Sequence, residues 1–203
     1  MKPIIRPGLL ALVVMGLAGC GSTKPIKYYA IQVPTAPVPT SSTYPIDLVV
    51  GRMTGPALLE AAPIVYRTGA NPKGTYQYHR WEDAPVDLVP EKLVRLLRST
   101  GEYRSVVRTG GVADSPYLIR GRLLQFEEVD GGGISGQVTM EFELYDRRAG
   151  KLLWSHFYSQ TEPVENKEIT SVVQAIDRNL ERGLKEVVAG LGQYFAANPP
   201  KKS

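Results

Sequence analysis

The C-terminal part of the chain carries a long amphipathic pattern that needs a large apolar partner surface. Apolar residues recur there at helical spacing over about seven turns: Ile169, Val172, Val173, Ile176, Leu180, Leu184, Val187, Val188, Leu191 and Phe195. The opposite face carries Asp177, Arg178, Glu181, Arg182, Lys185 and Glu186. These charges exclude a transmembrane helix, so the pattern predicts a helix over 169–195 whose apolar face packs on a sheet.

Three long strands precede this helix and predict an antiparallel meander. They cover residues 117–129, 137–147 and 151–161. The turn sequences Asp130-Gly131-Gly132-Gly133 and Arg148-Ala149-Gly150 join them by the short loops of hairpins. Apolar and polar residues alternate over 138–145, which is typical of a strand with one buried face.

The first half of the chain predicts shorter elements. Strands are expected at 27–33, 46–52, 63–68 and 76–81 and around 106–107, with an extended proline-rich connection over 34–45 and a turn over 69–74. An amphipathic helix is expected from the spacing of Val86, Val89, Leu93, Leu96 and Leu97, with its end at Gly101. Because proline is tolerated only in a first turn, Pro85 and Pro90 predict that its regular part begins near Leu88 or Val89.

These elements predict an α+β fold. We expect a largely antiparallel mixed sheet with two helices packed on one face, the second of them long and C-terminal. A length of 203 residues suits one domain, and neither a second domain nor an internal repeat is visible. With 43% hydrophobic residues, 20 Gly and 16 Pro, the composition excludes a fully disordered chain and a collagen-like repeat.

The chain contains one cysteine, Cys20, so a disulfide framework is excluded. The cysteine ends a segment with the features of an export signal. Lys2 and Arg6 give it a positive start, residues 8–17 are almost wholly apolar, and the small residues Ala18 and Gly19 precede the thiol. This pattern resembles the bacterial lipobox, in which the thiolate takes up a diacylglyceryl group as a thioether and cleavage then frees an amine for acylation.

The lipobox reading divides the chain into four parts. It predicts a signal peptide at 1–19 cleaved between Gly19 and Cys20, a lipidated N-terminus and short tether at 20–26, an α+β domain at 27–196 and a disordered tail at 197–203. The alternatives, an uncleaved membrane anchor and an ordinary buried cysteine, are weaker. A helix over 7–19 would rise only about 20 Å, against a hydrocarbon core of about 30 Å.

Cleavage of the signal peptide would lower the net charge of the chain that meets its partners. It removes Lys2 and Arg6, which leaves 184 residues and lowers the formal charge from +4 to +2. A net charge so close to zero gives no basic surface of the kind that binds nucleic acid. Membrane attachment would come instead from the diacylglycerol and the N-acyl chain on Cys20, which are of the palmitate type. The resemblance to lipobox proteins also implies outer-membrane sorting, since the residue after the cysteine is Gly21 rather than Asp.

The sequence gives little support for catalysis. It contains no G-x-S-x-G, S-x-x-K or H-E-x-x-H pattern and no paired-cysteine metal spacing. His79 and His156 lie far apart on predicted strands, which favours ordinary sheet positions over metal or acid–base roles. Residues 131–136 match G-x-G-x-x-G formally, but a strand follows them where dinucleotide binding needs a helix, so we expect a hairpin turn. No cofactor or metal is therefore expected.

A group of aromatic and basic residues gives the best candidates for a contact surface. The candidates are Tyr28, Tyr29, Arg80 and Trp81, with Tyr76 and Tyr78 near them. Tyr, Trp and Arg are enriched at protein interfaces. The alternative is that each of them simply fills a half-buried strand position.

The order of several short motifs resembles a known family. These are the lipobox, Tyr28-Tyr29, Asp47-Leu48-Val49-Val50-Gly51, Pro63-Ile64-Val65-Tyr66-Arg67, Arg80-Trp81, Tyr117-Leu118-Ile119-Arg120-Gly121, Leu124-Gln125-Phe126 and the final helix. The chain looks like the ABC-type transport auxiliary lipoproteins, which include the lipoprotein of the paraquat-inducible membrane-integrity system. The resemblance covers nearly the whole chain after Cys20.

The resemblance implies a non-catalytic accessory of an Mce-type lipid transport system. It would be a lipoprotein of the bacterial cell envelope, anchored to the outer membrane with its domain facing the periplasm. There it would dock the periplasmic Mce-domain protein of an ABC transporter, through a sheet edge or the long helix, with a homo-oligomer as a further possibility. Two alternatives stay open: a periplasmic carrier that binds a lipid between helix and sheet, and an envelope hydrolase, for which the sequence supplies no polar cluster.

Overall fold

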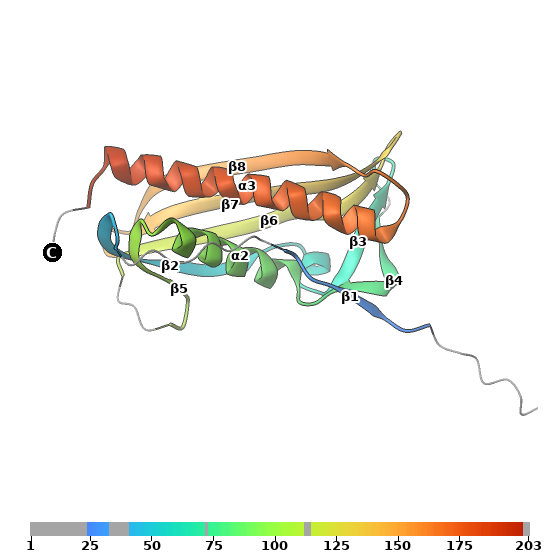
Figure 1. The fold of residues 1–203 in the computed structure, drawn as a ribbon, viewed down its shortest axis with the longest axis horizontal. Coiled ribbons are helices and arrows are strands. Elements are labelled where there is room, and N and C mark those ends of the chain that lie inside the picture. The colour runs from blue at the N-terminus through green and yellow to red at the C-terminus, as the bar shows by residue number, and fades with distance from the viewer. Residues whose placement is uncertain (1–23, 33–40, 72, 112–114, 201–203) are drawn as a thin grey trace, which may run out of the picture.

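The computed structural model describes residues 24–32, 41–71, 73–111 and 115–200. Its elements follow in chain order: β1 (Lys27–Tyr29), β2 (Tyr44–Thr54), the short 3-10 helix η2 (Ala57–Leu59), β3 (Pro63–Thr68), β4 (Lys73–Trp81), α2 (Pro85–Thr100), β5 (Tyr103–Arg108), β6 (Tyr117–Asp130), β7 (Ile134–Asp146), β8 (Lys151–Pro163) and α3 (Ile169–Ala197). The predicted fold class is confirmed: two helices accompany one mixed sheet, and the second helix is long and C-terminal (Figure 1).

The 14-residue strand β6 organises the sheet. On one side it pairs with β7 along its length, and β7 pairs with β8, so the predicted antiparallel meander is confirmed. On its other side, the first half of β6 pairs with β2 and its last four residues pair with β3, both in parallel. Beyond these strands, β5 pairs in parallel with β2, β4 pairs antiparallel with β3, and β1 pairs in parallel with β4.

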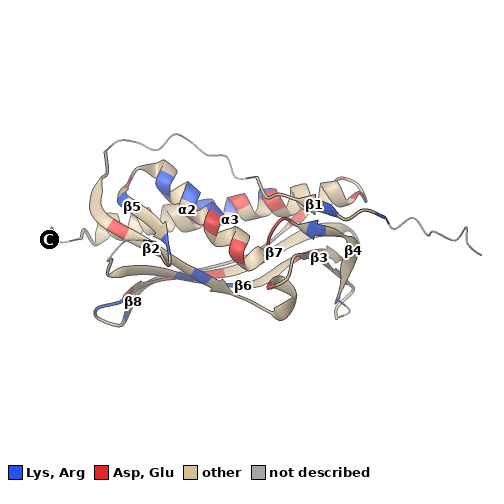
Figure 2. Ribbon diagram, turned by 90° about the horizontal axis from the view of Figure 1, so that it is seen from below, with Lys and Arg blue, Asp and Glu red and all other residues tan. Residues whose placement is uncertain are grey.

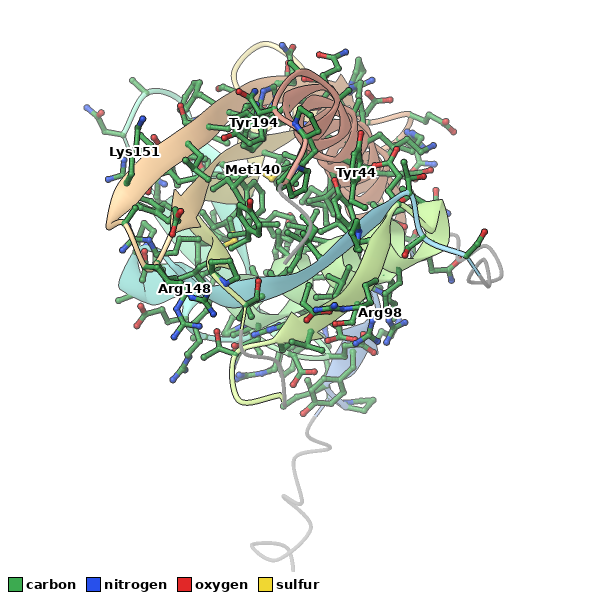
Figure 3. The ribbon with its side chains drawn as sticks, turned by 90° about the vertical axis from the view of Figure 1, so that its left-hand side faces the viewer. Tyr44, Arg98, Met140, Arg148, Lys151 and Tyr194 are labelled. Carbon is green, nitrogen blue, oxygen red and sulfur yellow. The ribbon has the colours of Figure 1, made fainter. Side chains whose placement is uncertain are left out.

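Both helices cover the same face of the sheet, as predicted (Figure 1). The α2 helix packs on β2 and β5, and α3 packs on β7 and β8. Glycines allow α3 to approach closely, since a Cβ at Gly136 of β7 would lie 2.8 Å from Ile176, and one at Gly183 of α3 would lie 2.5 Å from Met140. Seen from one end, the curved sheet encloses Met140, whereas Arg148 and Lys151 lie at the periphery (Figure 3).

The helix α2 corrects one prediction. It begins at Pro85 rather than near Leu88 or Val89, with Pro85 in its first turn and Pro90 inside it. A proline inside a helix removes one backbone hydrogen bond. Val86 and Val89 are buried in the core, so their packing outweighs this loss. The predicted end is confirmed, because Gly101 adopts a left-handed φ of 66° as the C-cap.

Several strand boundaries also differ from the predictions. The strand expected at 27–33 ends at Tyr29, because the buried Ile31 turns into the core, and Val33 lies outside the described residues. Strand β4 begins at Lys73, inside the predicted turn, and pairs with Arg67 of β3. At the other end α3 extends to Ala197, one residue past the predicted domain end, and 201–203 of the predicted tail lie outside the described residues.

Candidate functional site

The pairing of β1 with β4 brings most of the predicted contact residues together. Tyr28 lies opposite Arg80, and Tyr29 lies opposite Trp81. Tyr28 keeps 64% of its surface exposed. The Tyr29 hydroxyl lies 2.8 Å from Nδ1 of His79, so Tyr29 serves to hold β1 on β4. Of these residues, Tyr28 presents the most surface to a partner.

Trp81 is not a contact residue, which corrects the sequence interpretation. It has no exposed surface, and its ring lies 5.2 Å from the ring of Phe126 in the core. As the last residue of β4, it directs its side chain to the covered face of the sheet. Tyr76 is also structural, because its hydroxyl donates to Glu128 at 2.6 Å, and burial raises its pKa.

The histidines occupy strands, as predicted. His79 lies on β4 beside Tyr29, and His156 lies on β8, stacked at 5.9 Å on Trp154 with its Nε2 3.3 Å from Glu186. Within the described residues, no cluster of three His, Cys, Asp or Glu side chains is arranged to hold a metal ion. Residues 131–133 of the motif at 131–136 form the β6–β7 turn, with Gly132 at a φ of 106°, and residues 134–136 begin strand β7, so the hairpin interpretation is confirmed.

The sheet face opposite the helices carries a hollow that the sequence analysis missed. Its volume is about 400 Å³, and its lining includes Arg52, Arg120, Arg122, Glu141 and Glu143. The Arg120 guanidinium lies over the Tyr145 ring, 3.7 Å from its centroid, and Arg122 forms an ion pair with Glu141. Strand alternation places Arg120 and Arg122 on one face, so a signal for this cluster was available in the sequence.

Strand β8 forms the longest open edge in the described part of the chain. It has 13 residues and pairs with β7 on one side only. Between Lys151 and Glu162 it contains neither a charged residue nor a proline, the features that usually protect an edge from pairing. Phe157, at its centre, is 61% exposed. By contrast, the edge strand β1 has three residues, and the edge strand β5 carries Arg104 and Arg108.

Polar contacts attach α3 to this strand from the covered face. Asn179 has no exposed surface, and its Nδ2 donates to the carbonyls of Gly136 at 2.9 Å and Gln160 at 2.7 Å. Its Oδ1 accepts from the Tyr158 hydroxyl at 2.6 Å. Arg182 donates to Glu162 at 2.7 Å and lowers the pKa of that carboxyl. Strand β8 is therefore held in place although it has only one neighbouring strand.

The fold and these surfaces define a class of protein: an α+β domain with one helix-covered sheet face and an exposed sheet edge. A model of the family of ABC-type transport auxiliary lipoprotein components matches residues 29–188. Because the match covers most of the chain, the protein belongs to this family. No curated protein matches the sequence of this chain. Among the described residues, neither helix combines the length and apolarity needed to cross a membrane.

Solved structures support the fold. The crystal structure of protein XCC0632 from Xanthomonas campestris, assigned to family DUF330, is 18% identical, with a TM-score of 0.75 over 85% of this chain and 97% of that one. The hypothetical protein CT253 from Chlamydia trachomatis is 10% identical, with a TM-score of 0.53 over 76% of this chain and 99% of that one. At such identities the likeness concerns the fold alone. Cys20 and Gly19 lie outside the described residues.

Proposed function

We propose that this protein is a non-catalytic accessory lipoprotein of an Mce-type lipid transport system, anchored in the outer membrane and docked to a periplasmic Mce-domain protein. The family match carries this proposal, since it covers residues 29–188 and concerns transport auxiliary lipoproteins. The lipobox supports the anchor, which would consist of a diacylglyceryl group and an N-acyl chain on Cys20. A triacylated cysteine would hold the domain stably at a membrane.

Strand β8 is the docking surface that the structure favours. An extended segment of the Mce-domain protein can add to its open edge, where backbone N–H and C=O groups supply affinity and exposed side chains supply specificity. Phe157 gives such a segment an apolar anchor at the centre of the edge. The long helix is a weaker candidate, because its apolar face is buried against the sheet.

The filled interior favours an adaptor over a lipid carrier. Leu180, Leu184 and Leu191 on α3 and Phe142 on β7 are almost fully buried and occupy the layer between helix and sheet. A carrier would need that layer for an acyl chain. Delipidated adaptor should therefore extract no phospholipid from vesicles, and stoichiometric extraction would favour the carrier.

The docking proposal is tested by crosslinking and co-purification from detergent-solubilised envelopes. A Phe157→Lys variant should lose most of the Mce-domain protein that the tagged wild type retains. Leu58→Lys, at a position 42% exposed on η2, is the matched control and should retain it. A Cys20→Ser variant separates tethering from docking. Failure of any Mce-domain protein to accompany the wild type would overturn the proposal, and equal retention by the Phe157 variant would exclude β8 as the docking surface.

A further inference from the structure

The segment that leads into β1 presents uncovered apolar and basic side chains. Ile26 is 44% exposed and Tyr28 64% exposed, two residues apart along the chain. Lys24 and Lys27 are exposed beside them. The strand β1 lies beside β4 (Figure 2) and has no described strand on its other side. The patch Lys24, Ile26, Lys27 and Tyr28 is exposed throughout.

The patch is fixed to the body of the domain. Beyond the pairing of Tyr28 with Arg80, the backbone N–H of Glu82 donates to the carbonyl of Tyr29 at 2.9 Å. Ile31 is buried in the core, and the N–H of Gln32 donates to Asp177 of α3 at 3.2 Å. The domain therefore cannot move away from its first strand without breaking these contacts.

The chain between the predicted lipid and this patch is short. Only three residues, 21–23, separate Cys20 from Lys24, and Ile26 follows two positions later. Six residue steps span at most about 20 Å when fully extended. Tyr28, eight steps from Cys20, can lie at most about 28 Å from it. An acylated Cys20 lies at the bilayer surface, so the whole patch is held within about 28 Å of the headgroups.

We propose that Lys24, Ile26, Lys27 and Tyr28 form a membrane-contact patch that lies on the headgroup layer of the anchoring bilayer. The inference rests on the proposed lipidation of Cys20. Tyrosine suits a membrane–water interface because one end of its side chain is apolar and the other is polar. The two ammonium groups complement acidic headgroups. The tether supplies a high local concentration, so this small patch is sufficient to orient the domain.

Contact of this patch with the bilayer would set how the long axis of the domain is oriented relative to the membrane. The β7–β8 turn and the C-terminal end of α3 lie at the opposite end of the molecule from β1 (Figure 1). With β1 on the bilayer, Lys151 at the start of β8 lies at the membrane-distal end, and the strand runs back towards the membrane. The open edge of β8 would thus extend from the bilayer into the periplasm, where a partner can reach it.

The test places an environment-sensitive fluorophore at the patch in the lipidated protein. Full chain carrying Tyr28→Cys is expressed with its own leader, labelled with nitrobenzoxadiazole and reconstituted in vesicles of phosphatidylethanolamine and phosphatidylglycerol. Cys20, as a thioether, cannot take the label. Phe157→Cys is the matched control, since position 157 is similarly exposed on the far side of the sheet.

Brominated lipids should quench the label at position 28 at least threefold more strongly than the label at position 157. Equal quenching at the two positions, or emission typical of water at position 28, would overturn the membrane contact. Intact mass separates this outcome from failure of the proposed function. Protein without acyl groups refutes the lipoprotein, whereas acylated protein with a water-exposed label at position 28 refutes only the contact.

Discussion

The buried amide of Asn179 should be one of the most sensitive single side chains of the domain. Its Nδ2 donates to two strand carbonyls, those of Gly136 and Gln160, and its Oδ1 accepts from Tyr158. An Asn179→Ala change removes all three hydrogen bonds. The Tyr158 hydroxyl has a replacement, the backbone carbonyl of residue 179 at 3.0 Å. The carbonyls of Gly136 and Gln160 lose a donor that lies fully buried on the covered face of the sheet.

The size of the effect follows from these contacts. Each of the two carbonyls left without its donor costs about 1 to 2 kcal/mol, and alanine regains about 0.5 kcal/mol of helix propensity. Asn179→Ala should therefore lower the free energy of unfolding by about 2 to 3 kcal/mol. For a domain of this size that corresponds to a melting temperature roughly 5 to 10 °C lower.

Urea unfolding of the purified chain in mild detergent, followed by circular dichroism, measures this change. Asn198→Ala is the matched control, because its amide also donates to a carbonyl, that of Tyr194 at 3.0 Å, but lies exposed at the end of α3. It should cost less than about 0.5 kcal/mol. Tyr158→Phe, combined with Asn179→Ala, should cost less than the sum of the single changes, since the two share a hydrogen bond. A loss below about 1 kcal/mol for Asn179→Ala would refute the reasoning.

Two further predictions concern charged groups. The Glu127 side chain is 1% exposed and accepts hydrogen bonds from Arg67 at 2.9 Å and Lys73 at 2.7 Å. Glu127→Gln should therefore lower the free energy of unfolding in urea by about 2 kcal/mol. An unchanged midpoint of urea unfolding would contradict this. The pKa of Glu162 lies below its ordinary 4.5 because Arg182 donates to it, so its contribution is present above pH 4.5 and is lost as the pH falls through the lowered folded-state pKa. The stability gap between wild type and Glu162→Gln should therefore narrow from pH 6 to pH 3, and a constant gap would count against this linkage.

The elements that the sequence predicts well are those whose signal is local. Strands β6 to β8 are joined by tight turns, so their pairing follows from turn residues and from period-two alternation. The helix α3 follows from apolar spacing over its length, and its polar face already shows which side meets solvent. In both cases the deciding residues lie close together in the chain.

The remaining pairings depend on partners far apart in sequence. Strand β6 takes β2 beside its first half and β3 beside its last residues, and nothing in the local pattern of residues 117–130 marks that division. The burial of Trp81 depends in the same way on a distant residue, because its ring packs on Phe126, some 45 positions away. An aromatic residue at a strand end suits an interface or a core equally well. Its burial is decided only when β4 reaches its place beside β3.

The arrangement around β8 explains how an open edge can belong to a stable domain. An edge strand with one neighbour lacks half of its possible ladder, and a protein usually compensates with charges, prolines or a short length. Here α3 compensates from the covered face, because Asn179 binds the Gln160 carbonyl and Arg182 binds Glu162 near the end of the strand. These bonds hold β8 in place without occupying its outer face, where Phe157 lies. The edge thus stays extended and accessible, which is the condition for a partner strand to add without a large ordering cost.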